Sequence, residues 1–243
     1  WLWKYTPGGA VKFLGKVDTS AGSVDGRTTN GDIAFDSSGN LFIIRGSGTS
    51  TTIFSVKAAN VAAANGGAIV AAGSTGVTTV GSVNGAAFDS NGLGYLGNAT
   101  SVTSYTMPAW TNPSTVVSAG FSSADLATCS SPATVTLEKN ITGRFAAGDQ
   151  FTLSMNQGAS VLGTSTTSGS TTGVQDARVG PLPVVAGSTL TFAETAASGS
   201  LANYASSYQC TADGVAMAAS AVGSSGSVTI PPTAKEVICT LTN

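Results

Sequence analysis

Histidine is absent from this 243-residue chain, and charged residues are scarce. Asp, Glu, Lys and Arg make up 9% of the sequence, compared with roughly 25% in an ordinary soluble domain. Without histidine the chain has no imidazole base, no Ser-His-Asp triad and no histidine metal site. Its 10 Lys and Arg residues form no basic run, which argues against nucleic acids and anionic membranes as partners.

Long hydrophobic runs are also missing. Gly, Asn, Ser, Thr and Pro interrupt the uncharged stretch 90–124, so we expect no membrane-spanning helix and no direct membrane insertion. The chain begins at Trp1 without a targeting segment, which suggests a processed chain or a fragment. Hydrophobic residues make up 42% of the sequence, so the chain should fold. Low charge with abundant Ser, Thr, Ala and Gly is typical of a secreted β-protein, so we expect an extracellular, cell-surface location.

An internal repeat occupies the first half of the chain. The segment 31–42 recurs as 84–95, which places Phe35 and Phe88 53 residues apart. A second apolar segment recurs on a similar period, at 2–5, 53–56 and 104–107. Short strands, Gly-rich turns and a period of about fifty residues are typical of propeller blades.

These repeats resemble those of bacterial extracellular β-propellers. We therefore expect residues 1–124 to form a propeller-like region of two to three partial blades. Propellers usually need about 4 to 8 blades to close. Self-association, another surface chain or missing upstream sequence would have to complete the ring.

The sequence changes character near residue 125, where we place a linker (125–130) and a second domain (131–243). Four segments of this domain alternate between apolar and polar residues with a period of two: 134–139, 150–155, 189–194 and 236–242. Such segments, separated by Gly, Ser and Thr, predict an antiparallel Ig-like β-sandwich. The expected fold class is therefore all-β, with a partial propeller-like region followed by a sandwich.

Three polar residues fall on the apolar faces of the predicted strands: Lys139, Glu194 and Asn243. Glu138, next to the lysine, should point outward. Burying an isolated ammonium or carboxylate costs several kcal/mol, so these groups must be paired, neutralised or chemically consumed.

Desolvation lowers the pKa of a lysine and raises that of a glutamate, so both side chains can be neutral at pH 7. The Lys139 amine can then attack the carboxamide carbon of Asn243. Glu194 would polarise the carboxamide and relay a proton to the departing ammonia. The product is an isopeptide crosslink between the first and last strands. Two alternatives stay open: a buried Lys139–Glu194 salt bridge, or a lysine that reaches solvent without reacting.

Residues 131–243 resemble the SpaA-like, or collagen-adhesin B-type, surface modules of Gram-positive bacteria. The resemblance rests on three segments, Leu137-Glu138-Lys139, Glu194-Thr195 and Leu241-Thr242-Asn243, and the closing segment around Cys239 looks actinobacterial. It implies a prealbumin-like, pilin-type domain in which Lys139 bonds to Asn243 under catalysis by Glu194.

The three cysteines allow three disulfide pairings, each of which leaves one thiol over. The family resemblance favours the pair Cys210 and Cys239. Cys129 lies in the predicted linker and is either free or bonded to another chain. A cysteine nucleophile is not expected, because no histidine is present to activate it.

Other candidate sites are less specific. Trp3, Tyr5 and Trp110 could stack on sugars, although such residues more often form the core of a blade. The Asp-containing turns 36–40 and 89–92 superficially resemble calcium loops, but ordinary turn chemistry explains their Asp and Gly residues. We expect neither a metal nor a cofactor.

The sequence thus predicts a secreted cell-surface structural or adhesive protein, a stalk or fibre subunit. Its sandwich would be held by an isopeptide bond and a disulfide. Crosslinking happens once per molecule, so the chain is not an enzyme in the turnover sense. The alternative is a propeller-type module that binds a host glycan or protein, with the sandwich as a spacer.

Overall fold

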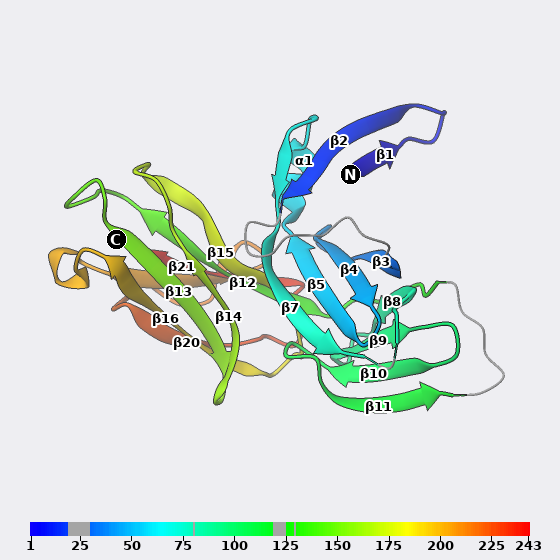
Figure 1. Cartoon of the computed structure of the whole chain (residues 1–243). Coiled ribbons are helices and arrows are strands. Elements are labelled where there is room, and N and C mark those ends of the chain that lie inside the picture. The colour runs from blue at the N-terminus through cyan, green and yellow to red at the C-terminus, as the bar shows by residue number, and fades with distance from the viewer. Residues whose placement is uncertain (19–29, 80, 119–124, 129) are drawn as a thin grey trace.

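Nearly all regular structure in the computed structural model is β, as the sequence pattern predicts (Figure 1). The structure describes residues 1–18, 30–79, 81–118, 125–128 and 130–243. The strands up to residue 117 form three sheets of three or four strands, and those from residue 133 onward form one sheet of six strands and one of four. An all-β fold is therefore confirmed.

The first sheet has the strand order β1-β2-β6. Its strands are β1 (Leu2–Tyr5), β2 (Val11–Asp18) and β6 (Ala68–Val70). β1 and β2 form an antiparallel hairpin, whereas β6 pairs with β2 in parallel. The short helix α1 (Ala58–Ala63) precedes β6 and ends before the Gly66-Gly67 pair. In the strand order of this sheet, β1 is an edge strand and pairs only with β2.

The second and third sheets are both four-stranded and antiparallel. The second consists of β3 (Asn30–Phe35), β4 (Leu41–Ser47), β5 (Ser50–Val56) and β7 (Ala72–Thr78), in that order. The third consists of β8 (Gly85–Phe88), β9 (Leu93–Gly97), β10 (Val102–Thr106) and β11 (Thr111–Val117). The repeated segments 31–42 and 84–95 thus begin two sheets of the same strand order. The described residues form no closed ring, and the propeller interpretation stays a prediction.

The turns of the two repeats share one hydrogen-bond pattern. Oδ1 of Asp36 and Oδ1 of Asp89 each accept two backbone N–H bonds from the following turn, at 2.8 to 2.9 Å. The donors are Ser38 and Asn40 in the first repeat and Asn91 and Leu93 in the second. Both carboxylates are therefore engaged in closing their own turns.

Apolar clusters join the three sheets face to face. One cluster lies between the first and second sheets and includes Leu14, Leu41, Phe54 and Val56. The other lies between the second and third sheets and includes Phe42, Ile53, Phe88, Tyr105 and Trp110. The second sheet is thus covered on both faces, because alternate residues of its strands point in opposite directions.

The remaining strands form a sandwich of two sheets. One follows the order β15-β12-β21-β17-β18, with β19 also paired to β17, and the other has the order β14-β13-β16-β20. The bounds are β12 (Ala133–Ile141), β13 (Gln150–Gln157), β14 (Ser160–Thr166), β15 (Gly173–Val184), β16 (Thr189–Ser198), β17 (Ser207–Ala212), β18 (Val215–Ala216), β19 (Ala221–Val222), β20 (Ser225–Thr229) and β21 (Glu236–Thr242). The 3-10 helix η1 (Leu201–Asn203) follows β16.

The sandwich differs in one respect from the antiparallel arrangement expected from the sequence. β12 and β21, the first and last strands, are parallel neighbours. Alternation shows which residues share a face, but it does not show which strand lies beside which or in what direction. The expectation of a wholly antiparallel sandwich was therefore wrong at this pair.

The two parts of the chain are in contact, with β5 and β7 lying against β14 and β15 (Figure 1). Glu138 points away from the sandwich interior, as predicted, but it is buried because Lys57 forms an ion pair with it across the interface. Asn40 Nδ2 also donates a hydrogen bond to Thr134 Oγ1, at 3.4 Å. Both faces of β12 are consequently covered. The exact domain boundaries, including the linker at 125–130, stay predictions.

Candidate crosslinking site

Three polar side chains enter the interior of the sandwich from different strands. Lys139 lies on β12, Asn243 directly follows β21, and Glu194 lies on β16 in the opposite sheet. Lys139 is paired in register with Leu241, two residues before Asn243. Because side chains two residues apart on a strand share a face, Lys139 and Asn243 are diagonal neighbours on the inner face.

Lys139 and Glu194 form an ion pair in this interior. Lys139 Nζ lies 2.7 Å from Glu194 Oε2, and both side chains have no exposed surface. Apart from this ion pair, Lys139 Nζ and both carboxylate oxygens of Glu194 have no hydrogen-bond partner among the described residues. The amine therefore keeps donor capacity for a further group.

Asn243 is held by its backbone, while its carboxamide is unengaged. Its N–H donates to the Asn140 carbonyl at 3.1 Å, and its backbone oxygen accepts from Thr142 N–H at 2.7 Å and Thr142 Oγ1 at 2.8 Å. Oδ1 and Nδ2 of Asn243 are both buried without a hydrogen-bond partner. An unsatisfied buried amide costs about 1–3 kcal/mol, and the Lys139 amine and the Glu194 carboxylate in the same core also lack hydrogen-bond partners.

The surroundings of Lys139 favour the neutral amine. Burial lowers the pKa of Lys139 below its ordinary value, and the neighbouring Glu194 carboxylate only partly opposes this shift. Lys139 Nζ also lies 4.9 Å from the centre of the Phe151 ring, which Tyr204 contacts edge-on. The amine is thus enclosed by apolar groups that exclude water. A neutral amine is a nucleophile, whereas an ammonium is not.

Three further residues support the site without a signal in the sequence: Thr142, Phe151 and Tyr204. Thr142 anchors the backbone of Asn243, and the two aromatic rings close the site on the side of β13. Tyr204 is held in place because its hydroxyl donates to Asp149 Oδ2 at 2.5 Å. The polar residue on an apolar face was the signal for Lys139, but these supporting residues follow ordinary strand and loop patterns and carry no such signal.

The expected disulfide between Cys210 and Cys239 is present. The two cysteines are directly opposite each other on the antiparallel neighbours β17 and β21. Cys239 also belongs to the apolar core of the sandwich. Cys129 lies outside the described residues. Within the described part of the chain, no group of three or more acidic or cysteine side chains is placed to hold a metal ion.

The candidate sugar-binding aromatics differ in their accessibility. Trp3 and Tyr5 are exposed on β1, but Trp110 is 5% exposed and packs against Phe88 and Tyr105. Trp110 is therefore a core residue and is not available as an open stacking surface.

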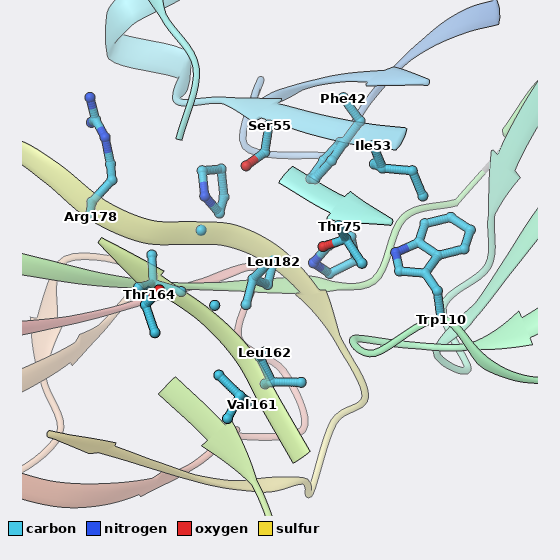
Figure 2. A pocket seen from close by; sticks show the side chains of 15 residues that line it. Phe42, Ile53, Ser55, Thr75, Trp110, Val161, Leu162, Thr164, Arg178 and Leu182 are labelled. Carbon is cyan, nitrogen blue, oxygen red and sulfur yellow. The ribbon is translucent and has the colours of Figure 1, made fainter. Parts of the chain in front are cut away.

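The indole of Trp110 lies at one end of a cavity of about 380 Å³ between the two parts of the chain (Figure 2). Phe42 and Ile53 lie beside the indole, and Val161 and Leu162 of β14 line the opposite wall. Arg178 is at the far end. The cavity is thus lined by both parts of the chain.

The second part of the chain is similar to a known protein family. Residues 134–243 match the SpaA family model described as a prealbumin-like fold domain. This stretch is similar to SpaA-like domains and is here called the prealbumin-like domain. The match covers β12 to β21 and includes Lys139, Glu194 and Asn243. The pilin-type resemblance of the sequence is therefore supported for the prealbumin-like domain.

Solved structures similar to the whole chain include two of the major pilin from Streptococcus pyogenes, one of them a mutant. The mutant structure is 12% identical, with 90% of this chain and 72% of that chain covered and a TM-score of 0.30. The second is 11% identical, with 89% and 72% covered and a TM-score of 0.30. At this TM-score the likeness is too distant to bear on function. Among curated proteins, no sequence matches this chain.

The described residues include no helix with the length and hydrophobicity that a membrane span requires.

Proposed function

We propose that this chain is a cell-surface structural subunit, part of a stalk or fibre, whose prealbumin-like domain forms an internal isopeptide bond between Lys139 and Asn243. One observation carries the proposal. An amine with a lowered pKa, a carboxylate and an unpartnered carboxamide converge in a dry core. Such a set is costly if it serves only as an ion pair, because the buried charges and the orphaned amide are not fully compensated.

The reaction is a transamidation that needs no external reagent. Transfer of a proton from Lys139 to Glu194 leaves a neutral amine and a neutral acid. Nζ then attacks Cγ of Asn243, while the Glu194 acid hydrogen-bonds the carboxamide and polarises it. As the Cγ–Nδ2 bond breaks, Nζ gives up one proton, Glu194 relays one proton to Nδ2, and Nδ2 leaves as ammonia. The Nζ–Cγ bond remains as an amide, and the net change is the loss of one ammonia.

Such a bond suits a protein that must withstand extension. Lys139 lies in the first strand of the domain and Asn243 follows its last strand, so the bond would join the two ends of the sandwich. Tension and proteases act by separating terminal strands first. An extracellular, adhesive or fibre-forming role follows from this mechanical argument, and the disulfide adds a second covalent tie.

The decisive experiment is the intact mass of the reduced protein, followed by tandem mass spectrometry of its tryptic peptides. We expect a mass lower than the sequence mass by one ammonia, and a branched peptide that joins Lys139 to Asn243. Glu194→Gln should abolish the loss. Glu138→Gln is the matched control, because Glu138 is the adjacent buried carboxylate on the opposite face of β12, and it should leave the loss intact. A wild-type mass equal to that of the reduced sequence would show that Lys139 is only ion-paired.

A binding role for the first part of the chain is the second candidate. The exposure of Trp3 and Tyr5 on one face of β1 favours it, since exposed aromatic rings can stack on sugars. A glycan array with the wild type and Trp3→Ala tests this candidate. Binding that disappears in the variant supports it, and the absence of binding to any glycan opposes it.

A further inference from the structure

Equivalent residues of the two sequence repeats have very different environments. Phe88 on β8 is 4% exposed, whereas its counterpart Phe35 on β3 is 49% exposed. Ile33, two residues before Phe35 and on the same face, is also exposed. Burying a phenylalanine contributes roughly 1.5–3 kcal/mol, so this face of β3 forgoes a large part of the stabilisation that β8 obtains.

The covering of Phe88 shows what Phe35 lacks. Phe88 packs against Phe42, with ring centres 5.2 Å apart, and Phe42 belongs to β4, the second strand of the preceding sheet. Phe35 lies in the second sheet, so the preceding sheet is the first one. By the same arrangement, the second strand of a complete first sheet would cover Phe35. Neither strand of the β1–β2 hairpin fills that position, since Phe35 is half exposed.

The sequence repeat explains the gap. Residues 2–5 (β1) align with 53–56 (β5) and 104–107 (β10), which belong to the third strands of the later sheets. β2 follows β1 and pairs with it antiparallel, as β7 pairs with β5. The first sheet therefore holds the third and fourth strands of a repeat. The first and second strands of that repeat would lie along the edge of β1 that faces away from β2. Among the described strands, none pairs with this edge.

A groove occupies the space where those two strands would lie. Its volume is about 510 Å³, and Leu2, Leu14, Ile33, Phe35 and Val61 are among the residues that line it. Lys4 and Lys12 also line the groove, and they are directly opposite each other in the β1–β2 register. Like charges in this position repel each other, which favours a partner that carries acidic groups.

We propose that this groove receives a β-hairpin that carries the same repeat pattern as β3 and β4. One hairpin strand pairs antiparallel with the free edge of β1, as β4 pairs with β5, and its apolar side chains cover Ile33 and Phe35. The edge offers unpaired backbone N–H and C=O groups, which a strand satisfies and an oligosaccharide does not satisfy in register. The inference is independent of the crosslink in the prealbumin-like domain.

The chain itself supplies the probe. A synthetic peptide of residues 30–47, the β3–β4 hairpin, contains the apolar pattern and two aspartates, and it can be cyclised because Asn30 and Gly46 are opposite each other. Cyclisation removes most of the ordering cost of an isolated hairpin. Binding to the full chain is measured by isothermal titration calorimetry, and its location by hydrogen exchange. We expect saturable binding and slowed exchange in β1 and β3.

Variants on both sides of the contact define the outcome. Phe35→Ser in the chain, or F42S in the peptide, should weaken binding at least about tenfold. Val116→Ser is the control, because Val116 is similarly exposed on β11 at the other end of the sheet array and should not matter. Ile33→Ser serves as a second variant if Phe35→Ser folds poorly. The proposal would be overturned if the cyclic peptide did not bind the wild-type chain. It would also be overturned if the Phe35→Ser and Ile33→Ser chains bound the peptide as tightly as the wild type does.

Discussion

At the scale of single residues, the core of the prealbumin-like domain combines opposing energetic demands. Lys139 and Glu194 are fully buried and only 2.7 Å apart, so their attraction is strong, but each has lost its hydration. Burial dominates for the lysine, whose pKa is lowered. Consumption of the amine in an amide bond removes the charge and its desolvation cost together. Before reaction, therefore, Lys139 should make the fold sensitive to pH.

The variant Asn243→Ala exposes this sensitivity, because it keeps the Lys139–Glu194 pair and removes the carboxamide with which Lys139 would react. The folded-state pKa of Lys139 lies below the ordinary value of 10.5, so the unfolded chain binds more protons between the two pKa values. The free energy of unfolding should consequently rise with pH across this window, by about 1.4 kcal/mol per unit of pKa difference. Urea unfolding from neutral pH to pH 10 measures the rise.

The double variant Asn243→Ala, Lys139→Met is the reference for this measurement, because it retains every other titrating group, including the tyrosines. The difference in unfolding free energy between the two variants isolates Lys139. A difference that stays constant with pH would contradict the lowered pKa and weaken the case for a neutral nucleophile.

At the scale of strands, β21 carries the disulfide and ends at the residue of the proposed isopeptide bond. This strand lies between β12 and β17, and Cys239 on β21 bonds to Cys210 on β17. The proposed isopeptide bond would attach the end of the same strand to β12. The last strand of the domain would then be covalently joined to both neighbours, which protects the position where a sandwich would otherwise open first.

Replacing both cysteines, Cys210→Ser with Cys239→Ser, should lower the free energy of unfolding by about 3 kcal/mol, because the disulfide no longer restrains the unfolded chain. Urea unfolding under non-reducing conditions measures the change. Wild-type protein in reductant should lose a similar amount. An unchanged transition midpoint in the double variant would show that the hydrogen bonds of β21 alone hold the strand.

The sequence predicted which face of each strand points into the core better than it predicted which strands are neighbours. Alternation located β12, β13, β16 and β21, since each has one face in an apolar core. The parallel contact of β12 and β21 could not be predicted, because it depends on the path of the whole chain. Glu138 shows the same limit: its outward direction was predictable, but its burial depends on Lys57, a residue distant in the sequence.

At the scale of the whole molecule, the proposed bond would determine how the chain responds to tension. Force that enters through the first part reaches the prealbumin-like domain at β12, and Lys139 lies two residues before the end of that strand. A bond from Lys139 to Asn243 would pass the force directly to the other end of the domain. Residues 140–242 would then form a closed loop outside the line of force and would not extend.

Single-molecule stretching with handles at the two ends of the chain tests this response. Under reducing conditions the wild type should extend only through the residues that precede Lys139. The Glu194→Gln variant should show an additional unfolding event with a length gain on the order of 350 Å, from the release of residues 140–242 at ~3.3–3.6 Å per residue. Glu138→Gln should behave as the wild type does. If the wild type gave the same event as Glu194→Gln, no covalent tie would join the two ends, and the domain would resist force only through its hydrogen bonds and core.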